Sequence, residues 1–236
     1  GFGIQDGRAR AAAERALALE SLELAGFHCH IGSQILELEG FRTAARVMGD
    51  FLATLRAECG FTAQVLDLGG GLGIRYTAAD EPPAIAECVG ETVAAIGEAC
   101  REHDHPLPGL ILEPGRSIVG EAGVTLYTVG TVKDLPGLRT YVAVDGGMAD
   151  NPRVALYQAV YEAALAGRVR GRKETLVSIT GKCCESGDML IWDINLPKPR
   201  PGDILAVFST GAYNYSMASN YNRLPRPAMV GCYRGA

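Results

Sequence analysis

Apolar residues in the first half of the chain alternate between helical spacing and short continuous runs. Residues 8–24 are rich in Ala, Leu, Glu and Arg, which favour a helix, and Gly26 follows them. Two further helices are predicted where apolar side chains recur every three or four positions, at Phe41, Ala44, Ala45, Met48, Phe51, Leu52 and Leu55 and then at Ile85, Val89, Val93, Ile96 and Cys100. Apolar runs at residues 27–31, 65–68 and 110–112 predict strands between the helices.

Helix, strand and Gly-rich polar loop thus recur three times in residues 1–120. This order is typical of a parallel α/β sheet or barrel, in which ligands gather at the carboxyl ends of the strands. After about Gly120 the pattern changes to strands joined by turns, at residues 124–132, 140–144, 176–179, 189–192 and 204–208. We expect residues 121–236 to form a mostly β domain.

One helix is predicted inside this second domain. Asn151 is expected to cap it and Pro152 to occupy its first position, and the helix is predicted to run through Ala166. The fold class predicted from these patterns is therefore α/β plus β, with one helix inserted in the β domain.

Composition excludes several classes of protein. Of the 236 residues, 47% are hydrophobic and 21% are charged, which is typical of globular proteins. A net charge of −5 without a basic cluster argues against nucleic-acid binding. No apolar stretch approaches the ~20 residues that a membrane span requires. The seven cysteines include no C-x-x-C pair, so we expect reduced thiols, a cytoplasmic location and no metal site.

Four polar loops are rich in glycine, at residues 30–34, 69–73, 113–116 and 211–213. Three of them follow predicted strands, where backbone N–H groups can converge on an anion such as phosphate. The triple glycine does not fit a dinucleotide fingerprint, because Ile74 or Tyr76 stands where that motif needs its third glycine. Any one of these loops could be no more than a tight turn between packed elements.

Taken together, the motifs are more specific than any single loop. They occur in a fixed order: His30-x-Gly32-Ser33-Gln34, Gly69-Gly70-Gly71, Glu113-Pro114-Gly115-Arg116, Val144-Asp145-Gly146-Gly147-Met148, Cys184-Glu185-Ser186-Gly187-Asp188 and Gly211-Ala212-Tyr213. This set resembles the diaminopimelate decarboxylases, pyridoxal-phosphate enzymes of the alanine racemase-like fold type. The resemblance implies the C-terminal part of a (β/α)8 barrel followed by a β domain. It also implies a homodimer whose active sites are shared across the interface.

The implied reaction is decarboxylation of meso-2,6-diaminopimelate to L-lysine and carbon dioxide, the last step of lysine biosynthesis. Pyridoxal phosphate serves as an electron sink, and its pyridine nitrogen needs a carboxylate beside it to stay protonated. The resemblance assigns this carboxylate to Glu113 and packs His30 against the ring. His28 would lie behind them on the same side of its strand. The plainer alternative for Glu113 is a strand-end carboxylate paired with Arg116.

The resemblance also implies the remaining binding residues. The cofactor phosphate would be held by Ser33, Gly69, Gly70, Gly71, Gly115, Arg116 and Tyr213. Arg153 and Tyr157 lie four residues apart and are expected to share one helix face, where with Arg116 they could bind a carboxylate. Glu185 would bind an ammonium group, beside Tyr213. Cys184, contributed by the partner subunit, would act in protonation at the substrate α-carbon, whereas Cys183 has no assigned role.

One family feature is missing from the sequence. Family members hold the cofactor as a Schiff base on a lysine well before the first of these motifs, whereas all lysines of this chain come later, at Lys133, Lys173, Lys182 and Lys198. We therefore expect the chain to be a fragment that lacks the N-terminal part of the barrel. Two alternatives stay open: a decarboxylase for another basic amino acid or polyamine precursor, and a non-catalytic homologue.

Overall fold

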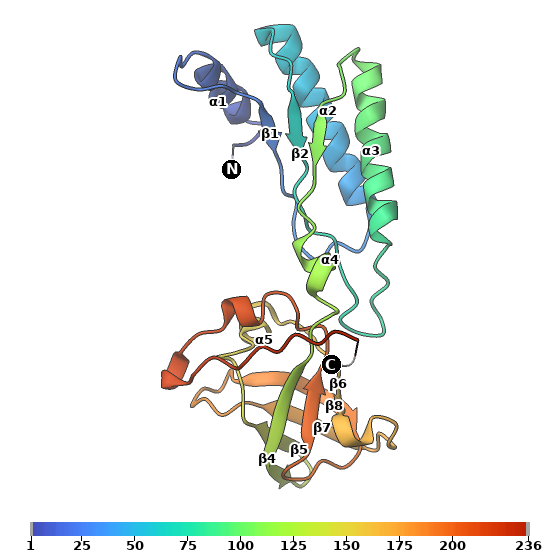
Figure 1. The fold of residues 1–236 in the computed structure, drawn as a ribbon, viewed down its shortest axis with the longest axis vertical. Helices are drawn as coiled ribbons and strands as arrows, with labels where there is room; N and C mark the ends of the chain where they lie inside the picture. Colours follow the sequence, from blue (N-terminus) through green and yellow to red (C-terminus); the bar gives the residue numbers. More distant parts are fainter. Residues whose placement is uncertain (1, 235–236) are drawn as a thin grey trace. The chain divides into compact units, whose positions relative to one another are not determined.

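A computed structural model describes residues 2–234, which form two compact units (Figure 1). The first unit comprises the described residues up to Gly73 together with residues 81–117. The second comprises residues 74–80 together with the described residues from Ile118 onward. Each unit has its own hydrophobic core, so each is described by itself.

The first unit is built on three parallel strands in the order β1 (Gly26–His28), β2 (Val65–Asp67) and β3 (Gly109–Ile111). Two long helices, α2 (Leu38–Cys59) and α3 (Ile85–Glu102), connect these strands and pack against each other (Figure 1). The short helix α4 (Gly115–Val119) follows β3. Because the strands are parallel, their carboxyl ends all lie at one edge of the sheet.

The first helix, α1 (Arg8–Leu17), is shorter than its composition predicts, and its expected extension to Leu24 is wrong. Only Ala9 and Ala13 of this helix are buried, so a longer helix would gain little apolar contact. The chain turns back over the next residues and enters β1 at Gly26, which lies directly against the backbone of Val65. Strand pairing therefore decides where the helix ends.

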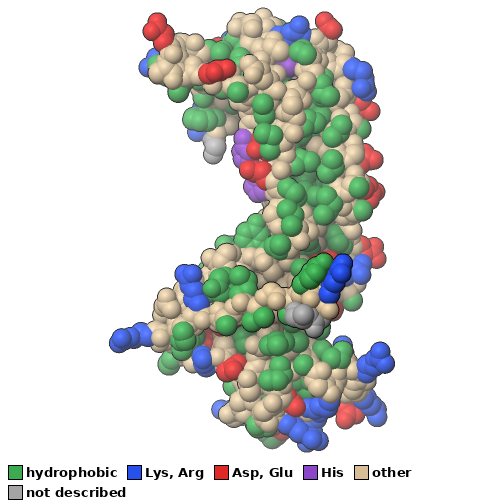
Figure 2. All heavy atoms as spheres, viewed as in Figure 1, with side chains coloured by type: hydrophobic (Ala, Val, Ile, Leu, Met, Phe, Trp, Pro, Cys, Tyr) green, Lys and Arg blue, Asp and Glu red, His purple; other side chains and the backbone are tan. Residues whose placement is uncertain are grey.

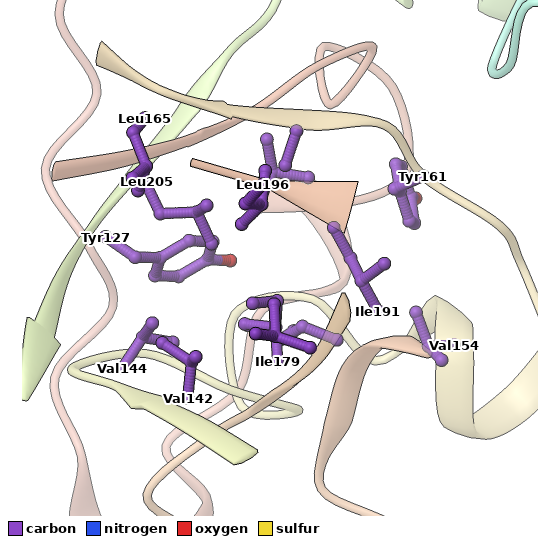
Figure 3. Packing of buried hydrophobic residues seen from close by; sticks show 14 of the residues in the cluster. Tyr127, Val142, Val144, Val154, Tyr161, Leu165, Ile179, Ile191, Leu196 and Leu205 are labelled. Carbon is purple, nitrogen blue, oxygen red and sulfur yellow. The ribbon is translucent and has the colours of Figure 1, made fainter. Parts of the chain in front are cut away.

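The second unit is a six-stranded sheet in the order β6-β9-β4-β5-β7-β8. Its strands are β4 (Thr125–Leu135), β5 (Arg139–Val144), β6 (Ala163–Leu165), β7 (Thr175–Thr180), β8 (Met189–Leu196) and β9 (Ile204–Val207). Pairing is antiparallel except between β5 and β7. Figure 3 shows the core, where Tyr127, Val142, Ile179, Leu196 and Leu205 point toward one another from five different strands.

The helix inserted in this unit, α5 (Arg153–Tyr157), contradicts the prediction that it runs through Ala166. Gln158 adopts a left-handed conformation with φ 53° and ends the helix. The residues of β6 that follow are all buried and pair with β9, so tertiary contacts override their helix propensity. Asn151 is not the cap either, because Pro152 occupies that position and forms no side-chain capping bond.

Three short 3₁₀ helices complete the second unit, at Ala166–Arg168, Tyr215–Met217 and Tyr221–Arg223. The cysteines of the described chain are all free thiols. Among the helices that the structure describes, none combines the length and apolar character needed to cross a membrane.

Candidate active site

Three chemically active side chains meet at the carboxyl ends of the parallel strands of the first unit. His28 ends β1 and is paired in register with Asp67, which ends β2, while Glu113 follows β3 by two residues. His28 Nε2 lies 3.3 Å from Glu113 Oε2, and one donor or acceptor atom of each of the three residues lies within 4.8 Å of the others. Figure 2 shows histidine side chains next to acidic side chains on the surface of this unit.

The glycine loop after β2 fits closely against its neighbours. Gly69 and Gly71 have positive φ angles of 67° and 99°, which residues other than glycine rarely adopt. At Gly70 the constraint is space, because a Cβ atom would collide with the carbonyl oxygen of Glu113. Only glycine therefore allows this loop to pass between the ends of β1 and β3.

Two backbone N–H groups of this loop, those of Gly69 and Gly70, have acceptors within the first unit. Gly69 N donates to Asp67 Oδ1 at 2.8 Å, and Gly70 N donates to His30 Nδ1 at 3.3 Å. Gly115 N likewise donates to the carbonyl oxygen of Glu113 at 2.8 Å. These three bonds organise the backbone at the strand ends, and the contact of these glycines with phosphate stays a prediction.

Two other residues expected near the phosphate lie together. Arg116 Nη2 donates to Ser33 Oγ at 2.7 Å, although the two residues are 83 positions apart in sequence. Arg116 is buried, and it belongs to the short helix that follows Glu113. A guanidinium and a hydroxyl side by side at strand ends are suitable donors for an anion.

In the second unit, α5 places Arg153 against aromatic side chains. Arg153 is 7% exposed, its Nη1 donates to the hydroxyl of Tyr76 at 2.8 Å, and its guanidinium lies over the rings of Tyr76 and Tyr213. Its Nε is buried and has no hydrogen-bond partner among the described residues. Tyr157, one turn later, is 64% exposed, so the structure gives these two residues different environments.

The loop that carries Cys184 and Glu185 is fixed by a buried carboxylate. Asp188 is 2% exposed and accepts the backbone N–H groups of Cys183 and Met148, each at 2.6 Å. Cys183 is buried and packs as a core residue, and this burial raises the pKa of its thiol. Cys184, its neighbour, is exposed.

Glu185 has a partner that the sequence pattern did not identify. The hydroxyl of Tyr221 donates a hydrogen bond to Glu185 Oε1, and this bond raises the pKa of Tyr221. Tyr221 lies in a segment with left-handed backbone at Asn222 and Arg223. No periodic signal marks such a segment, although the run Ser-Asn-Tyr-Asn is rich in turn-forming residues.

The residues of the first unit fit pyridoxal phosphate. The donor set offers a carboxylate at Glu113 for a cationic ring nitrogen and the Ser33–Arg116 pair for an anion. The ring of His30 accepts from the N–H of Gly70, the residue that packs against the carbonyl oxygen of Glu113. The glycine loop itself adds no side chain at these strand ends, because a Cβ at Gly70 would collide with the carbonyl oxygen of Glu113.

Comparison with known proteins gives consistent matches. Residues 1–120 match the pyridoxal binding domain of pyridoxal-dependent decarboxylases. Over 230 residues the chain is 55% identical to diaminopimelate decarboxylase of Bacillus subtilis, and this alignment covers 98% of this chain and 52% of that protein. Over 210 residues it is 50% identical to the Synechocystis enzyme of the same name, covering 89% and 45%.

Solved structures agree with these matches. Diaminopimelate decarboxylase from M. jannaschii in complex with L-lysine has a TM-score of 0.85 and 37% identity, covering 96% of this chain and 51% of that one. The Helicobacter pylori enzyme with L-lysine has a TM-score of 0.80 and 32% identity, covering 92% and 52%. The chain thus spans about half the length of the relatives it matches, and the predicted fold, part of a barrel followed by a β domain, is confirmed.

Proposed function

Because this chain belongs to the family of pyridoxal-dependent decarboxylases, we propose that the whole protein converts meso-diaminopimelate to L-lysine and carbon dioxide. One observation carries the choice of substrate. Arg153 presents a buried guanidinium whose Nε has no hydrogen-bond partner within residues 2–234, and it is set among aromatic rings in the second unit. Such a group is suited to a carboxylate, which a bidentate fork binds through Nε and Nη together.

The first unit supplies the cofactor residues in this proposal. When bound, pyridoxal phosphate provides the electron sink for the carbanion that loss of carbon dioxide leaves. Glu113 holds the protonated ring nitrogen, His30 packs against the ring, and Ser33 and Arg116 bind the phosphate. The glycine loop positions these groups through Gly70 and the carbonyl oxygen of Glu113.

The second unit supplies the substrate residues. Arg153 binds the distal carboxylate, Glu185 accepts the distal ammonium group, and Tyr213 and Tyr157 complete the site. Tyr221 holds Glu185 in place. The exposed thiol of Cys184 delivers a proton to the substrate α-carbon after carbon dioxide has left.

The proposal also includes the assembly and location of the protein. The site is shared across the interface of a homodimer, with Cys184 contributed by the partner. The free cysteines suit a reducing compartment, and we place the protein in the cytoplasm.

The test is decarboxylation by the full-length protein and its Arg153→Ala variant. We expect release of carbon dioxide from meso-diaminopimelate, with kcat/KM at least about a hundredfold lower in the variant because a charge-assisted bidentate contact is lost. Arg170→Ala, which changes an exposed arginine of the same unit, is the matched control and should act like wild type.

Three outcomes would contradict the proposal in different ways. If Arg153→Ala matched wild type, the role of this residue would be wrong. Turnover of ornithine or arginine in preference to diaminopimelate would indicate a decarboxylase for another basic amino acid. Tight binding of pyridoxal phosphate without turnover of any of these substrates would indicate a non-catalytic homologue.

A further inference from the structure

We propose that His28 is a positioning residue for Glu113, and that Asp67 joins this pair to the glycine loop. In this arrangement three neighbouring side chains at the ends of three strands act through two hydrogen bonds. The bond between His28 and Glu113 fixes the carboxylate that meets the cofactor ring nitrogen, and the bond from Gly69 to Asp67 fixes the loop beside the phosphate donors. The inference rests on the cofactor role proposed for Glu113.

The geometry of the sheet brings these residues together. Parallel pairing places His28 opposite Asp67, and Asp67 opposite Ile111. Glu113 lies two residues beyond Ile111, so an extended backbone turns its side chain to the same face. His28 and Glu113 have side chains that are 52% and 55% exposed, so the strand ends rather than burial hold them in contact.

The hydrogen bond defines what His28 does to the carboxylate. An ionised carboxylate only accepts, so His28 Nε2 must donate to Glu113 Oε2, at 3.3 Å. This bond occupies one carboxylate oxygen and leaves the other for a ligand. A free glutamate side chain loses considerable rotamer freedom when it is fixed, so a carboxylate held in advance binds its partner more tightly.

Asp67 lies next to this pair, with one carboxylate oxygen within 4.8 Å of the nearest polar atoms of His28 and Glu113, and it bonds the glycine loop. Its Oδ1 accepts the backbone N–H of Gly69 at 2.8 Å, at the residue where the left-handed turn begins. The next N–H, that of Gly70, donates to His30 Nδ1, so the proton of a neutral His30 ring is on Nε2. The two histidines of the His-Cys-His segment thus have opposite roles, His28 as donor to a carboxylate and His30 as acceptor from the loop.

The test measures cofactor binding by the full-length protein without reference to turnover. We compare the dissociation constant for pyridoxal phosphate and the absorption spectrum of the bound cofactor in wild type, His28→Phe and His28→Gln. Loss of the donor in His28→Phe should weaken binding about tenfold and shift the spectrum. His28→Gln retains an N–H donor and should recover binding to within about threefold of wild type.

The chain provides a matched control. His103 also bonds a carboxylate, with its Nε2 2.8 Å from Asp50 Oδ1, but this pair lies on α2 and at the end of α3 in the same unit. His103→Phe should therefore leave both the dissociation constant and the spectrum unchanged. If His28→Phe and His103→Phe weakened binding equally, the effect would be a general loss of stability and the inference would be wrong.

A double variant shows whether His28 acts through Glu113. If it does, His28→Phe should weaken binding no further once Glu113→Gln is present, so the two effects should not add. Additive effects, or a His28→Phe protein with the affinity and spectrum of wild type, would overturn the inference while leaving the proposed function intact. A wild-type protein that binds no pyridoxal phosphate would overturn both.

Discussion

At the scale of single residues, the glycine loop after β2 shows how closely the site is built. Gly70 is buried, and its neighbourhood leaves no room for a Cβ atom on the side of Glu113. A methyl group there would displace the carboxylate-bearing residue itself. Glu113 can therefore occupy its position only because Gly70, forty-three positions earlier, has no side chain.

Gly70→Ala should therefore abolish tight binding of pyridoxal phosphate and lower the stability of the first unit by about 1–3 kcal/mol. Cofactor titration and urea unfolding of the full-length protein measure the two effects. Gly90→Ala is the control, because Gly90 lies in α3 with nothing within 4 Å and alanine there should stabilise by up to about 1 kcal/mol. Equal behaviour of the two variants would show that the contact at Gly70 is unimportant.

A buried pair in the second unit gives a pH dependence. Tyr127 is 3% exposed, and its hydroxyl donates to Asp150 Oδ2 at 2.5 Å. Burial raises the pKa of Tyr127 well above its ordinary value, and burial also raises the pKa of Asp150 despite this hydrogen bond. Both groups are therefore easier to ionise in the unfolded chain than in the fold.

When a group has a higher pKa in the folded state than in the unfolded state, it contributes to the free energy of unfolding. This contribution is fully present at pH values below the unfolded-state pKa and is lost as the pH rises through the folded-state pKa. For Tyr127 this loss begins near pH 10, with a slope of at most about 1.4 kcal/mol per pH unit. Urea unfolding between pH 9 and 11 should show a shallower loss in Tyr127→Phe than in wild type. Tyr233→Phe, at a 73% exposed position, should keep the wild-type slope, and an unchanged slope in Tyr127→Phe would refute the assignment.

At the scale of elements, the helix pair α2 and α3 determines how the first unit packs. Gly49 of α2 faces Ala99 of α3 so closely that an added Cβ would lie 2.5 Å from the Ala99 methyl carbon. Small residues at a helix crossing allow close approach of the two axes. The crossing in turn supports the strands whose ends carry the site.

Gly49→Ala should consequently destabilise the first unit by about 1–3 kcal/mol through overpacking, against the gain in helix propensity that alanine otherwise gives. Gly97→Ala in α3 is the matched control, since a Cβ there meets only the end of the Arg101 side chain at 3.5 Å. Thermal unfolding should separate the two variants, and a stabilised Gly49→Ala would contradict the close crossing.

At the scale of the whole molecule, the cofactor residues and the lysines are in different parts of the chain. The first unit contains no lysine, whereas all four lysines belong to the second unit. The chain also spans about half the length of its curated relatives. The first unit therefore provides the carboxylate, the histidines and the phosphate donors of the proposed site, but no lysine beside them.

We expect the 236-residue chain by itself to release no carbon dioxide from diaminopimelate, even with added pyridoxal phosphate. The full-length protein should do so under the same conditions, and carbon dioxide release by both is readily measured with labelled substrate. Turnover by the isolated chain would show that the reaction requires no lysine from outside these 236 residues.

The sequence alone determined the family motifs, the fold class and the order of the strands and helices apart from α4 and β6. Periodicity located α2 and α3 because both bury one apolar face along their whole length. Helix propensity gave the wrong prediction at residues 18–24 and 158–166. There the pairing of β1, which begins at Gly26, and of β6 with their neighbouring strands determines the backbone conformation.

Only the tertiary structure showed which polar atoms meet. It joined His28 to Glu113, Asp67 to the glycine loop and Tyr221 to Glu185, contacts between residues far apart in sequence or without periodic spacing. It also showed that Arg153 is buried while Tyr157, one turn away, is exposed. Local patterns encode which face of an element is apolar, but hydrogen-bond partners depend on how separate elements approach in space, and that is set by the fold as a whole.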